Sequence, residues 1–349
     1  MNTAQPSRPA GEVPAAQVPA APRRAMMQAI MQHRYGTAPE DALRLEQTAV
    51  PAIAADEVLV QVRAAGVDRG TWHVMAGQPY LMRLLGFGFR GPKNPIPGLD
   101  VAGVVVAAGA DVTRFRAGDE VFGIARGSFA EYAAAREVTL ARKPARLSFE
   151  QAAALAVSGL AALQGLRDAG RIQPGQKVLI IGASGGVGSY AVQLAKVFGA
   201  EVTGVCSTAK AGLVRSIGAD HVIDYTRTDF ADGRQRYDLI LDIGGDSRLR
   251  RLRRALAPRG TLVIAGGEGG RWTGVGRQLR ALMLSPLVRQ RLTTYISGHR
   301  QADLEELRRL AEAGQVTPVI DRTWPLAGAP EAIRHLQAGQ ARGKIAITI

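Results

Sequence analysis

The chain has 349 residues, of which 46% are hydrophobic, and a formal net charge of +14 at pH 7. This length is enough for two domains with separate cores, and the hydrophobic content argues against general disorder. The longest apolar runs, such as residues 101–110, are far shorter than the roughly 20 residues that cross a bilayer. We therefore expect no transmembrane segment. The single cysteine, Cys206, excludes an internal disulfide and any multi-cysteine metal site.

The basic charge is spread along the whole chain as arginine, together with abundant alanine and glycine. This pattern indicates a compositional bias rather than one binding face, so we expect no nucleic-acid partner. The densest basic run, residues 247–260, has leucines at helical spacing and predicts an amphipathic helix with a solvated basic face. Residues 1–24 are rich in Pro and Ala, which predicts a flexible tail. They lack the apolar core of a secretory signal, and we expect a cytoplasmic protein.

The chain from residue 25 to 147 alternates short apolar runs with Gly, Pro and Asp. Such runs predict strands and turns, and hence a mainly β domain. The expected strands are residues 25–32, 56–67, 98–109, 118–124 and 129–135.

A different pattern begins at Ser148, a predicted N-cap with Gln151 at the third helical position, followed by a helix over residues 148–166. Apolar strands then alternate with helices, which predicts parallel βαβ units in a doubly wound sheet. The expected strands are residues 178–182, 201–206, 221–225, 237–245, 261–267 and 293–298. One expected helix follows the first of these strands and ends at residue 198, and two others cover residues 208–217 and 247–260.

The closing residues 301–349 contain two predicted helices and two predicted strands, too few for a third domain. We expect them to return and pack on the first domain. The predicted fold is therefore α/β, with a mainly β domain over residues 25–147 and 301–349 and a Rossmann domain over residues 148–300.

The run GASGGVG, residues 182–188, joins an apolar strand to a helix. Glycines permit a tight turn and close approach of a pyrophosphate, which the free N–H groups of the helix start then bind. The flanking strand and helix supply the context that a dinucleotide-binding site requires. The predicted cofactor residues here are Ser184, Gly185, Gly186, Val187 and Gly188.

The glycine spacing is one residue longer than in GxGxxG. The arrangement of Gly175-Gln176, Leu179, residues 183–186, Gly188, Gln193 and Lys196 resembles the signature of the quinone oxidoreductase and zeta-crystallin branch of the medium-chain dehydrogenase/reductase superfamily. The resemblance covers nearly everything from Ala25 onward. It implies a GroES-like catalytic domain, a nicotinamide cofactor in the cleft between the two domains, and a homodimer.

The choice between NAD and NADP depends on the end of the second Rossmann strand. Cys206, Ser207 and Thr208 stand where an acid would bind the ribose of NAD, and Lys210 follows. Hydroxyls and a cation suit the 2′-phosphate of NADP(H), which is the cofactor we predict. Ser207 or Thr208 capping the next helix is an alternative that does not exclude this role.

Further cofactor positions follow from the resemblance alone. Tyr225 matches a residue that contacts the same phosphate, with simple packing as the alternative. Lys344 matches a lysine that approaches the cofactor across the cleft, with a solvated lysine as the alternative. The strand ends implied at the nicotinamide half are Gly244, Gly266 and Gly267.

Zinc alcohol dehydrogenases of the superfamily polarise a carbonyl through a metal held by Cys and a His-Glu pair. In this chain Asp68 stands in the place of the cysteine and Leu99-Asp100 in that of His-Glu, so we expect no metal site. Hydride transfer without a Lewis acid suits acceptors that are already electrophilic, such as quinones and α,β-unsaturated carbonyls.

The catalytic candidates are Asp68, Thr71, Trp72, His73 and Tyr80. Relatives carry Asn in place of Asp68 and Asp in place of Thr71. An ionised Asp68 cannot donate a hydrogen bond, so His73 or Tyr80 is the better donor by chemistry, with a packing role as the alternative for each.

The sequence thus predicts a zinc-independent, NADPH-dependent reductase of a small quinone or enone. A zinc-free alcohol dehydrogenase or an enoyl-thioester reductase stays open, as does an NADPH-regulated RNA-binding or structural role like that of crystallin relatives. Residues 267–292 are longer than a crossover needs. They are open to a role at the substrate entrance, in a dimer face, at a membrane surface or in ordinary packing.

Overall fold

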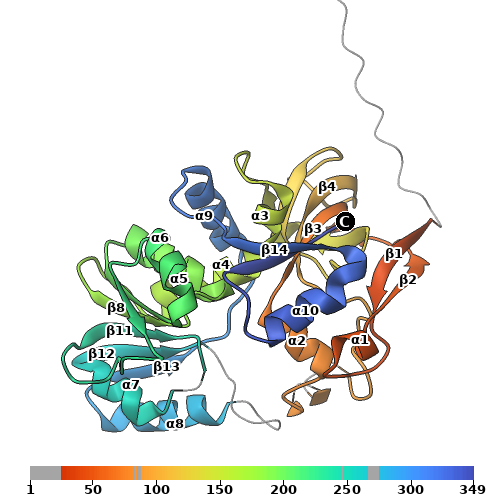
Figure 1. Ribbon diagram of the computed structural model, residues 1–349. Coiled ribbons are helices and arrows are strands. Elements are labelled where there is room, and N and C mark those ends of the chain that lie inside the picture. The colour runs from red at the N-terminus through yellow and green to blue at the C-terminus, as the bar shows by residue number, and fades with distance from the viewer. Residues whose placement is uncertain (1–24, 82, 85–87, 246, 266–274) are drawn as a thin grey trace, which may run out of the picture.

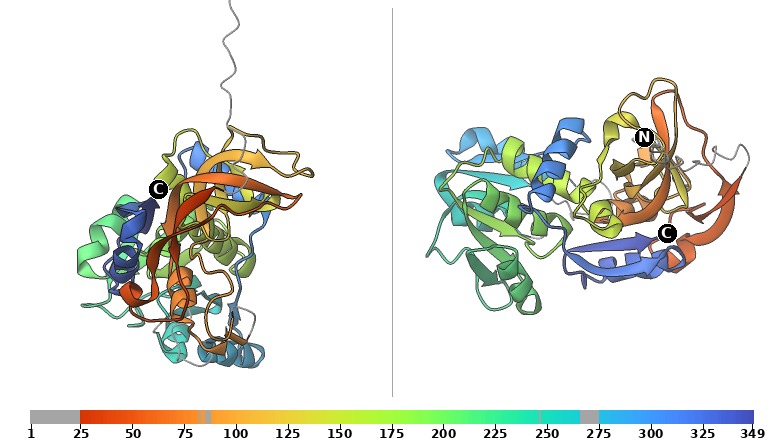
Figure 2. Two further views of the ribbon diagram at one scale, coloured as in Figure 1. Left: turned by 90° about the vertical axis from the view of Figure 1, so that its right-hand side faces the viewer. Right: turned by 90° about the horizontal axis from the view of Figure 1, so that it is seen from above.

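The computed structural model describes residues 25–81, 83, 84, 88–245, 247–265 and 275–349. Figure 1 shows two lobes, each built on one large β-sheet, and Figure 2 shows the lobes side by side when seen from above. This architecture confirms the predicted combination of a mainly β domain and a Rossmann-type parallel sheet. Within the described residues, no helix is long and apolar enough to span a membrane.

The first lobe holds a seven-stranded sheet in the order β14-β15-β3-β4-β5-β7, with β6 also paired to β3. All its pairings are antiparallel except that of β14 with β15. A small sheet of β1 and β2 and the helices α1, α2 and α10 complete the lobe (Figure 1). The bounds are β1 Met26–Met31, α1 Pro39–Ala42, β2 Arg44–Ala49, β3 Glu57–Val67, α2 Arg69–Ala76, β4 Asp100–Ala108, β5 Glu120–Ile124, β6 Tyr132–Arg136, β7 Leu140–Arg142, β14 Ile320–Pro325, α10 Ala329–Gln337 and β15 Lys344–Thr348.

The second lobe holds a six-stranded parallel sheet in the order β10-β9-β8-β11-β12-β13. In Figure 1, α5 and α6 lie on one side of this sheet and α7 and α8 on the other, as a doubly wound fold requires. Because helices cover both faces, strands such as β8 are continuous apolar runs. The bounds are β8 Lys177–Ile181, α5 Gly186–Val197, β9 Glu201–Cys206, α6 Ala211–Ser216, β10 His221–Asp224, β11 Tyr237–Asp242, α7 Leu249–Ala255, β12 Leu256–Ile264, α8 Gly276–Leu284 and β13 Arg291–Thr294.

The closing segment returns to the first lobe. β15 pairs antiparallel with β3, with Ile345 opposite Val67, so the end of this segment lies in the first-lobe sheet. Between the lobes, α3 (Phe149–Ala153) contacts β3 and β4, while α9 (Gln301–Glu312) contacts α4 (Ala156–Gln164) and β7. The domain boundaries at residues 147 and 300 stay a prediction, since these helices join both lobes.

Several predicted elements differ in detail from the structure. The helix expected over residues 247–260 ends at Ala255, and residues 256–260 belong to β12. The helix expected over residues 148–166 is divided into α3, α4 and a π-helical turn, Gly165–Ala169, although the Ser148–Gln151 capping box is present. The helix expected over residues 208–217 begins as a 3-10 turn, Thr208–Lys210. The last Rossmann strand ends at Thr294, because the following residues leave the sheet to bind α4.

Candidate active site

The glycine turn lies at the carboxyl end of β8, and Gly185 is the N-cap residue of α5. No side chain caps this helix, so its first N–H groups stay available to an anion. A Cβ on Gly188 would lie 2.0 Å from the Gly182 carbonyl oxygen, so only glycine permits this close packing of turn and helix. The predicted set of Ser184, Gly185, Gly186, Val187 and Gly188 therefore forms a cradle that fits a pyrophosphate.

Lys344 of β15 lies against this cradle and is 1% exposed. Its Nζ is 2.9 Å from Asp100 Oδ2 and 3.2 Å from Ser158 Oγ. A Cβ built on Gly186 would be 3.1 Å from Lys344 Cδ. The lysine expected from the resemblance is thus beside the glycine turn, and the alternative of a solvated lysine is wrong.

Asp100 is fully buried at the start of β4 and joins both lobes. Its other oxygen, Oδ1, accepts a hydrogen bond of 2.7 Å from the Val157 backbone N–H of α4. Burial raises the pKa of Asp100, and the Lys344 ammonium acts in the opposite direction. Sequence reasoning placed this residue only as the counterpart of a zinc ligand. The lysine 244 positions away gave no local signal of the ion pair.

The expected 2′-phosphate site follows β9. Cys206 is buried at the strand end, where burial raises its thiol pKa, and Ser207 caps the next turn without a side-chain hydrogen bond. Lys210 Nζ donates to the carbonyls of Gly339 and Ala341, at 2.8 and 2.7 Å. The predicted cation is therefore held in place by two carbonyls from the closing segment.

Two charged residues at this end escaped sequence reasoning. Burial lowers the pKa of Lys210, and so does the nearby guanidinium of exposed Arg342, which adds a second cation. The Thr208 hydroxyl donates to the Asp224 carboxylate and lowers its pKa, so an acid also lies here, on the neighbouring strand β10. Only the folded sheet brings these strand ends together.

Other predicted cofactor residues are placed as follows. Tyr225 is exposed, and its backbone N–H donates to the Cys206 carbonyl, so the ring is not packed in the core. The Gly244 backbone N–H donates to the Ile181 carbonyl beside the glycine turn. Gly266 and Gly267 lie outside the described residues.

Asp68 and Thr71 form the start of α2. Asp68 Oδ1 accepts from the Thr71 backbone N–H at 2.8 Å and from its hydroxyl at 3.3 Å, as an N-cap does. Asp68 Oδ2 is buried and has no hydrogen-bond partner among the described residues. One carboxylate oxygen of Asp68 thus caps α2, while the other is an acceptor at the N-terminus of the helix.

The remaining catalytic candidates follow on α2 and the turn after it. Trp72 and His73 form an edge-to-face pair with ring centroids 4.9 Å apart, and His73 Nδ1 donates to the Gln78 carbonyl at 3.0 Å. Tyr80 lies further on, with the Arg83 guanidinium 4.8 Å from its ring centre. His73 is therefore fixed in one ring orientation by its backbone partner.

His299 is a functional candidate that sequence reasoning did not select. It is exposed, yet it is close enough to Asp68 for the carboxylate to raise its pKa, against a larger lowering by the surrounding protein. The Asp68 carboxylate also raises the pKa of Asp100. The charge of Asp68 therefore acts on both His299 and Asp100.

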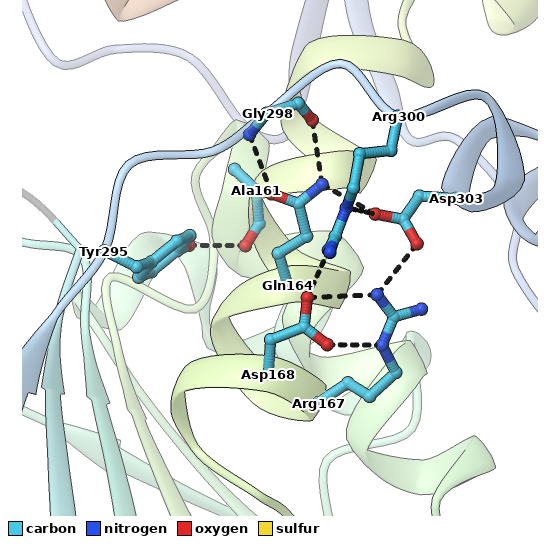
Figure 3. Close-up of polar contacts among 8 residues, drawn as sticks. All are labelled: Ala161, Gln164, Arg167, Asp168, Tyr295, Gly298, Arg300 and Asp303. Atoms are coloured by element: carbon cyan, nitrogen blue, oxygen red, sulfur yellow. Dashed lines mark hydrogen bonds and ion pairs between the residues drawn. The ribbon is translucent and has the colours of Figure 1, made fainter.

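Figure 3 shows how the backbone next to His299 is held. Gln164 of α4 makes two hydrogen bonds of 2.8 Å with Gly298, one to its carbonyl and one from its N–H. Arg300 Nε donates to Asp303 at 2.8 Å, and Asp303 also accepts from Gln164 at 2.8 Å. The segment that carries His299 is thus anchored on both sides of it.

The comparisons with known proteins agree with this geometry. Residues 54–145 match the model of the alcohol dehydrogenase GroES-like domain, and residues 217–347 match that of the zinc-binding dehydrogenase. The chain is 34% identical to a 2-methylene-furan-3-one reductase of Solanum lycopersicum over 90% of its length and 76% of the relative's. The chain belongs to the medium-chain dehydrogenase/reductase superfamily.

Two further members extend the likeness. An NADPH-dependent alkenal/one oxidoreductase of Arabidopsis thaliana is 32% identical over 88% of this chain and 76% of the relative. The structure of a quinone oxidoreductase from Coxiella burnetii matches with a TM-score of 0.82 and 27% identity, over 93% of this chain and all of the other. This superfamily member is an oxidoreductase that binds a nicotinamide cofactor.

The name of the second matched family includes zinc, but the local residues do not fit a metal. Leu99 and Asp68 stand at two of the expected ligand positions, and Asp100 is paired with Lys344. Throughout the described residues, no three His, Cys, Asp or Glu side chains gather in a group that would hold a metal ion.

Proposed function

We propose that the protein is a zinc-independent, NADPH-dependent reductase of quinones or α,β-unsaturated carbonyls. The buried Lys344–Asp100 pair carries the proposal, since Asp100, which stands at an expected zinc-ligand position, is bound instead by a lysine that lies beside the glycine cradle. Bound NADPH would supply the hydride. The names of the relatives, an alkenal/one oxidoreductase and a quinone oxidoreductase, point to the same acceptor classes.

The preference for NADPH is supported by the cations Lys210 and Arg342 near the end of β9. A 2′-phosphate there would receive charge-assisted hydrogen bonds. Lys210→Ala combined with Ser207→Ala should weaken NADPH binding far more than NADH binding, measured by quenching of protein fluorescence. Equal losses for both cofactors would contradict the assignment.

The proton that completes reduction of an enone needs a donor near the hydride acceptor. His73 and Tyr80, and now His299, are the side chains whose chemistry supports this role. Asp68 instead accepts hydrogen bonds as the α2 cap, which positions the helix that carries Trp72 and His73.

Assembly and location complete the proposal. β13 is the last strand of the parallel sheet, and its outer edge is not paired with a strand among the described residues. An antiparallel pairing of two β13 edges would form a homodimer, which light scattering would detect as a doubled molar mass. The cytoplasmic location predicted from the sequence is tested by cell fractionation.

The direct test is oxidation of NADPH and of NADH with a simple quinone and a simple enone in the presence of a metal chelator. Chelator-resistant turnover that prefers NADPH is the expected result. Loss of turnover on chelation, restored by zinc, would overturn the metal-free reaction. Turnover only with an acyl thioester or an alcohol would favour the alternative reductase or dehydrogenase activities.

A further inference from the structure

The outer side of α8 is apolar although it is exposed. Ala281 faces the core and is fully buried, whereas Leu279, Leu282 and Met283 are 54%, 44% and 75% exposed. Leu287, in the 3-10 turn that follows, is 80% exposed. Spacings of three and four residues place Leu279, Leu282 and Met283 along one side of α8, and Leu287 follows in the next turn. These four side chains are here called the apolar stripe.

The apolar stripe lies within an uninterrupted basic stretch. Residues 269–302 contain no Asp or Glu. Arg280 is exposed within α8, and Arg289 is exposed directly after the stripe. The sequence around the stripe therefore has a single sign of charge.

A second basic feature lies next to the stripe, on α7. An open basin of about 770 Å³ is lined by nine residues, of which seven are arginines and none is acidic. Asp229 neutralises part of this charge through Arg251 and Arg254. The lining residues of this arginine basin are Arg236, Arg248, Arg250, Arg251, Arg253, Arg254, Pro258, Arg289 and Gln290.

The arginine basin adjoins the end of the apolar stripe. Gln290 Oε1 accepts from Arg253 Nε of α7 at 3.0 Å, and its Nε2 donates to the Arg253 carbonyl at 2.9 Å. Leu287 of the stripe and Arg289 of the basin are two residues apart. Figure 1 shows α7 and α8 on the same side of the parallel sheet.

Surfaces that lie on anionic bilayers combine exposed apolar side chains, such as leucine and methionine, with clustered basic side chains, such as arginine. The apolar side chains enter the region between headgroups and acyl chains, and the guanidinium groups bind lipid phosphates. We propose that the apolar stripe and the arginine basin dock this protein on an anionic lipid membrane.

Two other occupants fit less well. A nucleic acid would use the arginines but leave the apolar stripe in water. A second copy of the chain placed against this surface would bring one arginine basin toward another, and the like charges would repel each other. Pairing of β13 edges would use the backbone of that strand, while the stripe points away from the core that Ala281 faces.

The arginine basin is remote from the glycine turn. Arg236 directly precedes β11, whereas the glycine turn follows β8, which is parallel to β11. The arginine basin and the glycine turn therefore lie at opposite ends of the sheet, whereas α8 begins at the glycine-turn end, where Arg277 pairs with Asp242 at the end of β11. Access to acceptors dissolved in the lipid would be the benefit, a point that rests on the proposed function, whereas the docking itself does not.

The test is co-sedimentation of the full-length protein with vesicles of phosphatidylcholine alone or mixed with phosphatidylglycerol. Wild-type protein should bind only the mixed vesicles, and salt should weaken the binding. Met283→Glu with Leu287→Glu should abolish binding. Arg250→Glu with Arg289→Glu should lower the partition coefficient by about fivefold or more for each charge removed.

Val138→Glu provides the matched control, because Val138 is an exposed apolar residue, 43% accessible, in the other lobe. It should bind like wild type, and all variants should keep wild-type NADPH oxidation with a soluble acceptor. Equal vesicle binding by wild type and both double variants would overturn the proposal. So would a fall in molar mass of the Met283→Glu, Leu287→Glu variant, or binding of RNA that is lost in the arginine variant while vesicle binding is unchanged.

Discussion

Lys344 of β15 and Asp100 of β4 form an ion pair of 2.9 Å in which both side chains are almost wholly removed from solvent. The pair lies where the first-lobe sheet meets α4 and the start of α5, with Ser158 as a third partner. The ion pair therefore contacts both the junction of the two lobes and the glycine turn at the start of α5.

Removing one partner of this pair should be strongly destabilising. Asp100→Asn leaves a buried ammonium without its counter-ion, and Lys344→Met leaves a buried carboxyl group. Each should lower the free energy of unfolding by about 3–5 kcal/mol. The double variant should lose less than the sum of the two, as urea denaturation would show. Losses below about 1 kcal/mol in both single variants would mean that the pair contributes little.

Local sequence features predicted much of this fold. The Ser148–Gln151 capping box and the apolar run of β8 each carry their own signal, and both are present. β2 was missed because its residues are mostly exposed and lack an apolar alternation. The division of α3 from α4 was missed because alanine and leucine run through the break without Gly or Pro.

The candidate site likewise contains some features that the sequence predicted and others that it did not. The glycine cradle is local and could be predicted, whereas Lys344–Asp100, Arg342–Lys210 and Asp68–His299 each join distant parts of the chain. Such pairs depend on sheet order and on the return of the closing segment. No spacing in the sequence encodes them.

The glycine turn offers a steric test with an internal contrast. Gly188→Ala would place a Cβ 2.0 Å from the Gly182 carbonyl oxygen, whereas Gly212 in α6 has open space around it. Gly188→Ala should destabilise the protein by about 1–3 kcal/mol and impair NADPH binding. Gly212→Ala should be neutral or stabilising by up to about 1 kcal/mol. Thermal unfolding of both variants decides the matter, and equal effects would contradict the tight turn.

Arg342 should contribute to the choice of cofactor. It is exposed and close enough to lower the pKa of Lys210, which places its charge at the same end of the site. Arg342→Ala should weaken NADPH binding about tenfold or more, through loss of a charge-assisted hydrogen bond, and leave NADH binding nearly unchanged. Arg322, an exposed arginine stacked on Trp324, provides the control, and Arg322→Ala should bind both cofactors normally. Unchanged NADPH affinity in Arg342→Ala would remove it from the site.

The network of Figure 3 should stabilise the protein in a pH-dependent way. Hydrogen bonds from Arg167 and Arg300 lower the pKa of Asp168 below its ordinary value of 3.8. The stabilisation is therefore complete above that value and is lost as the pH falls through the lower, folded-state pKa. Asp168→Asn should lower the free energy of unfolding near neutral pH. The difference in this free energy between variant and wild type should become smaller as the pH falls. Urea titrations at a series of pH values measure this, and a constant difference at every pH would contradict it.

His299 and Asp68 provide the sharpest test of the site. Desolvation by the surrounding protein lowers the pKa of His299 from its ordinary value, although the side chain keeps contact with solvent, and the Asp68 carboxylate acts in the opposite direction. Asp68→Asn should keep the α2 cap, since Asn caps helices as well as Asp, but it removes the charge. The pKa of His299, followed by the NMR shift of its ring protons, should therefore fall in this variant.

If His299 supplies the proton, turnover should fall as the pH rises through that pKa, and Asp68→Asn should move the fall to lower pH. His299→Gln should remove this limb of the profile, while His33→Gln, at an exposed histidine paired with Glu46, should not. A wild-type profile in His299→Gln would exclude His299 as the donor and leave His73 and Tyr80. An unchanged His299 pKa in Asp68→Asn would show instead that the two side chains do not interact across the site.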